Sequence, residues 1–182
     1  MKRIISIAIL TALLISSLTG CGSGAEPTET TTALSVPDMT AEEILDNFED
    51  LMSNPALADE YTVTRLPADE IADTGETNQW LMIKDTLLGY SYMVGVFSDT
   101  DGNAYLAQVS TDNASMEYIS FSLFCFYLYK AMGFPEMDAE AFYDTFGLVS
   151  REPEGSMTIG AWDLSALLID DYLTFTAIYK AQ

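Results

Sequence analysis

Few side chains in this sequence are of the types that commonly carry out chemistry. The chain has two cysteines, Cys21 and Cys125, and no histidine. Hydrolytic mechanisms that use an imidazole base, and zinc sites built on histidine, are therefore excluded. Cys125 stands between Phe124 and Phe126, whereas a catalytic thiol needs an accessible, electropositive setting. We therefore expect Cys125 to be a small core residue, and we predict no catalytic residue.

A short run of oxygen-bearing side chains is a candidate cation site. Asp99, Asp101 and Asn103 stand at alternate positions, which is a ligand pattern that calcium uses. However, Gly102 falls at the fourth position of this run rather than the sixth, and Ser110 rather than Glu stands at the twelfth. A polar turn is therefore the favoured interpretation, and a weak cation site is the alternative. No other metal and no cofactor is predicted, because no phosphate-binding glycine loop or dinucleotide fingerprint is present.

Carboxylates and aromatic side chains supply the remaining candidates. Pairs of carboxylates perform acid–base catalysis in glycosidases. The chain has 28 acidic residues, so some lie close together by chance, and no particular pair is predicted. Most of the ten Tyr, nine Phe and two Trp are expected in the core. Trp162 is followed by Asp163 near the final strands, and it is a candidate contact for a protein or glycan partner.

The other cysteine follows an export signal. Lys2 and Arg3 precede an apolar run over residues 4–14, which is too short for a permanent span of roughly 20 residues. Leu18-Thr19-Gly20-Cys21 then places one apolar and two small residues before a cysteine. This sequence resembles the lipobox of bacterial membrane lipoproteins, and the resemblance covers only residues 1–21. It implies that the signal is cut before Cys21 and that the Cys21 thiol receives a diacylglycerol.

The lipobox implies the organisation and location of the whole chain. Each buried acyl methylene contributes ~0.8 kcal/mol, and two chains hold a protein far better than one. We therefore expect a signal peptide over residues 1–20 and a lipid anchor on Cys21. The anchor is expected to hold the mature chain on the cell membrane, facing outside the cytoplasm. Small polar residues follow the anchor and indicate a flexible tether over residues 21–37. Residues 38–182 are then expected to form one extracytoplasmic domain.

The charge of the mature chain excludes one class of partner. Of the seven basic residues, Lys2 and Arg3 belong to the signal, which leaves five against 28 acidic residues and a net charge of −23. Nucleic acid is excluded as a partner, because its phosphates must be met by Lys and Arg. The favoured interpretation of this charge is an acidic surface that keeps the domain soluble. The alternative is a site for cations or basic peptides. With Cys21 lipidated, no intramolecular disulfide can form, so packing alone must hold the domain together.

The sequence patterns predict an α+β fold. Thr40 and Glu43 form a capping box before an amphipathic helix that ends at Asn54-Pro55. The β-rich runs 90–97 and 104–109 flank a loop that contains Asp and Gly, which indicates a hairpin.

Residues 114–132 mix strand-like alternation with helix-end signals, and we predict a buried helix there. Asp138 then caps a short helix that ends at Gly147, and the runs 157–169 and 172–180 flank Asp170-Asp171 as a final hairpin. This order favours an antiparallel sheet of hairpins with about three helices packed on one face.

Three functions are compatible with these features. The favoured hypothesis is a non-catalytic, lipid-anchored binding or assembly module whose partner is an envelope protein, a basic peptide or a glycan. The alternatives are a carboxylate-dependent hydrolase of envelope glycan or peptide, and a small solute-binding lipoprotein. A hydrolase needs a pocket with two carboxylates, one of them buried. A receptor needs a deep cleft. A module needs an apolar patch rimmed with acid.

The lipobox generates a direct chemical prediction. We expect Cys21→Ala to abolish the incorporation of labelled palmitate into the protein, because the substitution removes the thiol that accepts the lipid. Metabolic labelling followed by immunoprecipitation measures this. Cys125→Ala is the matched control, since it removes the other thiol of the chain and should leave the label unchanged. Label that persists on Cys21→Ala would contradict the anchor.

Overall fold

The computed structural model describes residues 39–70, 75–112, 118–150, 153–169 and 171–180. The helices are α2 (Ala41–Met52), α3 (Pro55–Ala58), α4 (Tyr118–Ala131) and α5 (Ala139–Thr145). The strands are β1 (Tyr61–Arg65), β2 (Asp69–Glu70), β3 (Thr77–Asp85), β4 (Ser91–Ser98), β5 (Ala104–Thr111), β6 (Ser156–Ile159), β7 (Trp162–Ile169) and β8 (Tyr172–Tyr179).

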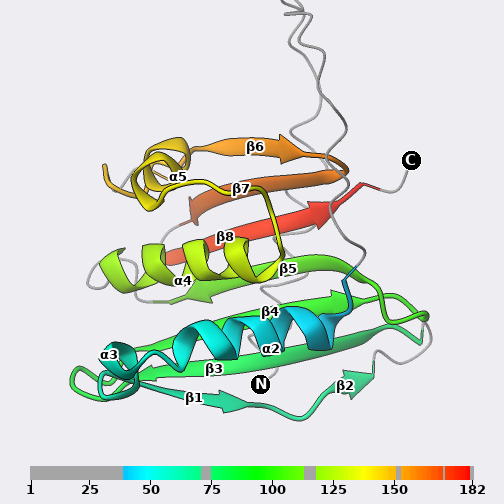
Figure 1. Cartoon of the computed structure of the whole chain (residues 1–182), viewed down its shortest axis with the longest axis horizontal. Helices are drawn as coiled ribbons and strands as arrows, with labels where there is room; N and C mark the ends of the chain where they lie inside the picture. The colour runs from blue at the N-terminus through cyan, green and yellow to red at the C-terminus, as the bar shows by residue number, and fades with distance from the viewer. Residues whose placement is uncertain (1–38, 71–74, 113–117, 151–152, 170, 181–182) are drawn as a thin grey trace, which may run out of the picture. The chain divides into compact units, whose positions relative to one another are not determined.

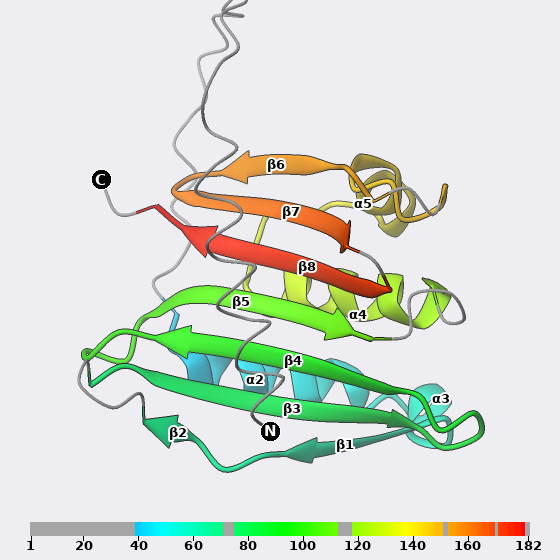
Figure 2. The same cartoon turned by 180° about the vertical axis from the view of Figure 1, so that it is seen from behind.

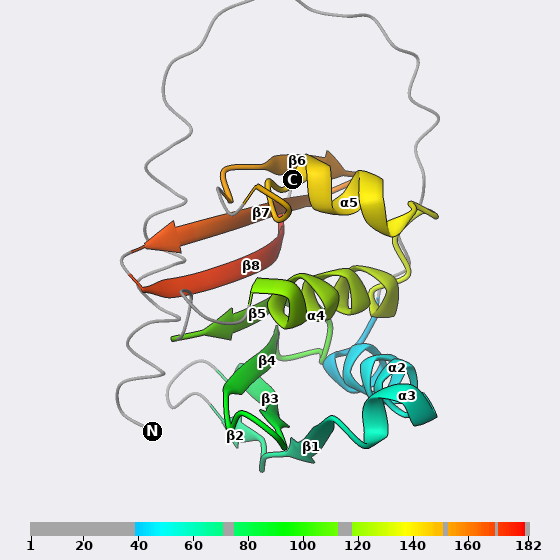
Figure 3. The same ribbon diagram turned by 90° about the vertical axis from the view of Figure 1, so that its left-hand side faces the viewer.

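The strands form one antiparallel sheet in the order β1-β3-β4-β5-β8-β7-β6, and β2 also pairs with β3. The described helices lie together on one face of this sheet, as Figure 1 and the side view in Figure 3 show. Seen from behind in Figure 2, the strands present the other face. The predicted α+β class, with an antiparallel sheet of hairpins and helices on one face, is confirmed.

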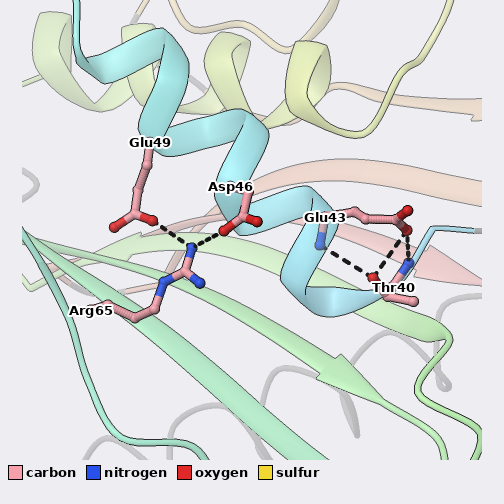
Figure 4. Close-up of polar contacts among 5 residues, drawn as sticks. All are labelled: Thr40, Glu43, Asp46, Glu49 and Arg65. Atoms are coloured by element: carbon pink, nitrogen blue, oxygen red, sulfur yellow. Dashed lines mark hydrogen bonds and ion pairs between the residues drawn. The ribbon is translucent and has the colours of Figure 1, made fainter.

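Helix α2 begins where the sequence predicts. The Thr40 hydroxyl oxygen accepts a hydrogen bond from Glu43 N at 3.2 Å, and Glu43 Oε2 accepts one from Thr40 N at 2.9 Å (Figure 4). These reciprocal bonds satisfy backbone donors that a helix start otherwise leaves open. The same contacts hold the pKa of Glu43 below its ordinary value. One face of α2 is buried over the sheet through Ile44, Leu45 and Phe48.

Helix α4 is buried on almost every side, which explains why its sequence lacks a clear helical period. Ten of its 14 residues are buried, and α4 packs beside α2, α5 and β5. The centroid of the Phe124 ring lies 4.8 Å from that of Tyr92 and 5.1 Å from that of Tyr61, and both contacts are edge-on. Gly133 follows with a φ of 67°, a left-handed conformation that ends helices and favours glycine. The helix predicted over 114–132 is therefore present from Tyr118, and residues 113–117 lie outside the described part.

Aromatic rings join α5 to α4 and to the sheet. Phe142 on α5 is fully buried. Its ring centroid lies within 6 Å of those of Phe126 and Tyr129 on α4, Phe146 after α5, and Phe175 on β8. The predicted N-cap also holds, since Asp138 Oδ1 accepts from Ala141 N at 2.9 Å. Because the described part of the chain contains no disulfide, this aromatic packing is a principal link between the helices and the sheet.

The C-terminal part differs from the prediction in its number of strands. The run 157–169 was expected to be one strand, but it contains β6 and β7, joined by a tight turn at Gly160. Gly160 has a φ of 59°, which residues with a Cβ rarely adopt. The predicted hairpin on either side of Asp170-Asp171 is present as β7 and β8. A further short helix, α3, follows Asn54, whose Oδ1 accepts from Ala56 N at 3.0 Å.

One ion-pair cluster links α2 to the first strand. Arg65 on β1 lies 2.7 Å from Asp46 and 2.5 Å from Glu49, which are one helical turn apart on α2 (Figure 4). Burial disfavours the Arg65 charge, but its two carboxylate partners outweigh this effect and hold its pKa above the ordinary value. All three side chains are about a third exposed or more, so each pair contributes about 1 kcal/mol or less.

The two ends of the sheet carry different features. The described chain starts beside the β4–β5 turn, where Ala104 N donates to Met39 O at 3.0 Å. The end of β8 lies at this same end in Figure 1. The β3–β4 turn, the start of α4, the end of α5 and the end of β7 gather at the opposite end (Figure 1). Met39 and the end of β8 therefore lie away from this second set of elements.

The aromatic cluster generates a stability prediction. We expect Phe142→Ala to lower the free energy of unfolding by about 3–5 kcal/mol, because it removes a fully buried ring and leaves a cavity. Chemical denaturation followed by tryptophan fluorescence measures the change. Val149→Ala, at a side chain that is 65% exposed, should change stability by less than about 0.5 kcal/mol. Equal effects at the two positions would contradict the arrangement described.

Candidate functional site

The predicted cation residues lie in the β4–β5 turn. Asp99 Oδ1 accepts hydrogen bonds from Asp101 N and from Asn103 N, both at 2.9 Å. Gly102 has a φ of 87° and its N–H donates to Asp99 O at 3.0 Å. Asp99 therefore stabilises a polar turn through its own backbone neighbours. Within the described residues, no group of three His, Cys, Asp or Glu side chains is placed to hold a metal.

The other residues considered from sequence are enclosed in the core. The Cys125 side chain is fully buried, and desolvation raises the pKa of its thiol well above the ordinary value. A neutral, enclosed thiol is a poor nucleophile. Trp162, the candidate partner contact, is 6% exposed, and its ring packs against those of Phe134 and Tyr179. Its indole therefore packs inside the domain at the start of β7. Little of this side chain is available for contact with a partner.

Cys21 and the whole lipobox lie outside the described residues, as do the signal peptide and the tether. The lipid anchor therefore stays a prediction from the sequence. None of the helices in the described ranges combines the length and the apolar character that crossing a membrane requires.

A catalytic carboxylate pair needs at least one buried carboxyl group. In the described part of the chain, Asp85 is the one buried acidic residue. Its Oδ1 accepts from Leu87 N at 2.8 Å and from Leu88 N at 2.5 Å, which closes the β3–β4 turn. These two backbone hydrogen bonds account for the buried carboxylate of Asp85, and a substrate is not needed to explain its position.

A groove of about 410 Å³ opens between α4 and the segment that includes α5. Seven of the described residues line it: Tyr118, Ile119, Ser122, Leu123, Tyr143, Leu148 and Val149. None of them is charged. The Ser122 hydroxyl donates to Tyr118 O at 2.7 Å, within α4 itself. Desolvation, more than the neighbouring Cys125 and Tyr127, raises the pKa of Tyr143, so its phenol stays protonated at neutral pH. The lining is equipped to bind an apolar group and lacks an acid–base pair.

The groove was not predicted from sequence. Helix α4 is apolar all round, and its exposed side becomes visible only when its neighbours are placed. Ile119 is 83% exposed, and Leu123 and Tyr127 are partly exposed at four-residue intervals from it. Residues four apart share one face of a helix. The three side chains therefore form an apolar stripe on α4, and its first two members line the groove.

Other exposed aliphatic side chains lie outside the groove. Large apolar residues that are scattered singly on a surface are ordinary, so these side chains do not by themselves indicate a binding site. Outside the groove, the β3–β4 turn carries Leu87, which is 88% exposed, and Leu88. The end of β7 carries Leu168 and Ile169, which are 42% and 37% exposed.

Comparison with known proteins adds no family assignment. No protein-family model matches the chain, and no curated protein or solved structure shows significant similarity to it. The function must therefore be argued from the geometry of the chain itself.

The turn at Asp99 generates a prediction that separates its two interpretations. We expect Asp99→Ala to lower the free energy of unfolding by about 1–2 kcal/mol, because two backbone donors lose their acceptor. The loss should be the same with and without millimolar calcium chloride, as measured by thermal denaturation. If calcium stabilises the wild type and not Asp99→Ala, the cation-site interpretation holds and the turn alone is insufficient.

Proposed function

We propose that this chain is a lipid-anchored module on the outer face of the cell membrane that binds another envelope component and performs no catalysis. The apolar groove between α4 and α5 carries this proposal. The described residues of its lining are uncharged, and Ile119 and Val149 at its edge are 83% and 65% exposed. A stable domain gains nothing from exposing such side chains, whereas a partner that covers them gains their burial.

The position of the groove also favours binding. The described chain enters the domain at Met39, beside the β4–β5 turn, and the groove lies at the other end of the sheet. A partner in the groove therefore contacts the domain at the end remote from Met39. The acidic net charge of the mature chain keeps the rest of the domain soluble while this apolar surface stays exposed.

The hydrolase alternative has less support. A carboxylate-dependent hydrolase places two carboxyl groups in a pocket about 5–9.5 Å apart. Among the described residues that line the groove there is no carboxylate, and Asp85 accepts hydrogen bonds within its own turn. The chemistry of the described residues therefore favours recognition over bond cleavage.

Crosslinking in the native cells tests the proposal. We expect a tagged full-length chain, crosslinked in intact cells and recovered under denaturing conditions, to retain one reproducible envelope component. Cys21→Ala should lose it, because the unanchored chain no longer meets its partner at the membrane. The replacement of both Ile119 and Val149 by Ser should lose it as well, while the anchor remains in place.

Leu87→Ser provides the matched control for this experiment. It removes an aliphatic side chain of similar exposure that lies outside the groove, and it should retain the component. A captured component that is unaffected by the groove substitutions would place the binding surface elsewhere on the domain. An empty capture from wild-type cells would contradict the proposed module.

A further inference from the structure

The apolar stripe on α4 has the dimensions of a helix-binding site. Ile119 and Leu123 are one helical turn apart on one wall, and Tyr143 lies on α5 across from them, with Leu148 and Val149 beyond it. Helices that bind in grooves insert apolar side chains spaced three or four residues apart. The groove of about 410 Å³ accommodates a few such side chains and is too small for a folded domain.

The charge around the groove is strongly one-sided. The segments 118–123 and 138–150, which contain the described lining residues, carry three acidic residues, Asp138, Glu140 and Asp144, and no basic residue, for a net charge of −3. On α5, the exposed Glu140 and Asp144 flank Tyr143, which lines the groove. An apolar groove with acidic neighbours attracts cationic partners and repels anionic ones.

None of the described basic side chains is among the residues that line the groove. Arg65 is paired with two carboxylates on α2, and Lys180 with Asp163 on β7. Lys130 lies in the last turn of α4, where its Nζ is 5.3 Å from the centre of the Phe126 ring. Lys84 lies on β3. None of these cations neutralises the acidic residues beside the groove lining.

We infer that the groove binds a basic amphipathic helix of a partner protein, with aliphatic side chains of that helix against Ile119, Leu123 and Val149 and its Lys or Arg side chains beside Glu140 and Asp144. This assignment rests on the proposed function and specifies the chemistry of the partner. An acyl chain also fits an apolar groove, but the acidic surroundings disfavour the negative headgroup of a fatty acid or an anionic lipid. A neutral glycan would leave the aliphatic side chains without apolar contact.

Three synthetic peptides test the assignment on the full mature lipoprotein in phosphatidylcholine nanodiscs. The first is a helix of Lys and Leu with Leu on one face. The second has the same composition with Leu distributed around the helix, and the third replaces Lys by Glu. We expect the first to bind, by fluorescence anisotropy after subtraction of empty nanodiscs, at least tenfold more tightly than the other two. Its affinity should fall as salt concentration rises.

Variants separate the apolar contribution from the charge contribution. Ile119→Ser or Val149→Ser should each weaken binding of the first peptide about tenfold, since one aliphatic side chain loses its cover. Leu87→Ser, outside the groove, should change nothing. Replacement of Glu140 by Gln together with Asp144 by Asn should weaken binding about threefold at low salt and flatten the salt dependence. The same replacements at the exposed Glu42 and Asp50 of α2 are the matched control.

Each result decides a separate part of the assignment. Equal binding of the first two peptides would overturn the role of the groove, because charge alone would then suffice. Equal binding of the acidic peptide would overturn the basic character of the partner. If none of the peptides binds, or if an acyl chain binds more tightly than the first peptide, the assignment fails. A crosslinked component that is lost on substitution of Ile119 and Val149 would still support the proposed function in that case.

Discussion

The burial of α4 is the constraint on which the rest of this structure depends. Ten of its 14 residues are buried, and α2, α5 and β5 are each positioned against it. Phe124 inserts between two tyrosines of the sheet, and Asn47 on α2 donates to Ala131 O at the end of α4 at 3.1 Å. No disulfide assists these contacts in the described residues. Hydrophobic burial, which has no fixed direction, is therefore made specific by the shapes of interlocking aromatic rings.

The sequence predicted elements whose signals are local. The capping box of Thr40 and Glu43, the Asp138 cap and the β4–β5 hairpin are all present because a few neighbouring residues determine them. The turn between β6 and β7 was missed, since Gly160 is followed by Ala161 rather than by a strong turn partner, and the apolar residues continue on both sides. The groove was beyond prediction for another reason. Helix α4 carries apolar residues on every side, so which side stays open depends on where α2 and α5 pack, and these contacts are long-range.

The roles of the acidic residues bear directly on the function of the domain. They are numerous enough to suggest carboxylate chemistry, yet the buried one that the structure describes, Asp85, accepts hydrogen bonds from its own turn. Others cap helices or pair with Arg65. What remains distinctive is the contrast between this polar surface and an uncharged groove at the end remote from Met39. Such a contrast of apolar site and acidic surroundings gives selectivity by charge as well as by shape.

The enclosed thiol of Cys125 has a consequence for how the chain matures. An extracytoplasmic compartment is oxidising, and an unpaired thiol there is open to mixed disulfides until it is shielded. In the folded domain Cys125 is fully buried within α4, so the native protein resists such adducts without any reducing partner. For a chain that is exported, as the sequence predicts, the hazard is confined to the interval between export and the docking of α4 on the sheet. If α4 docks slowly, some chains would therefore form a mixed disulfide at Cys125. The modified side chain would then prevent α4 from packing into the core.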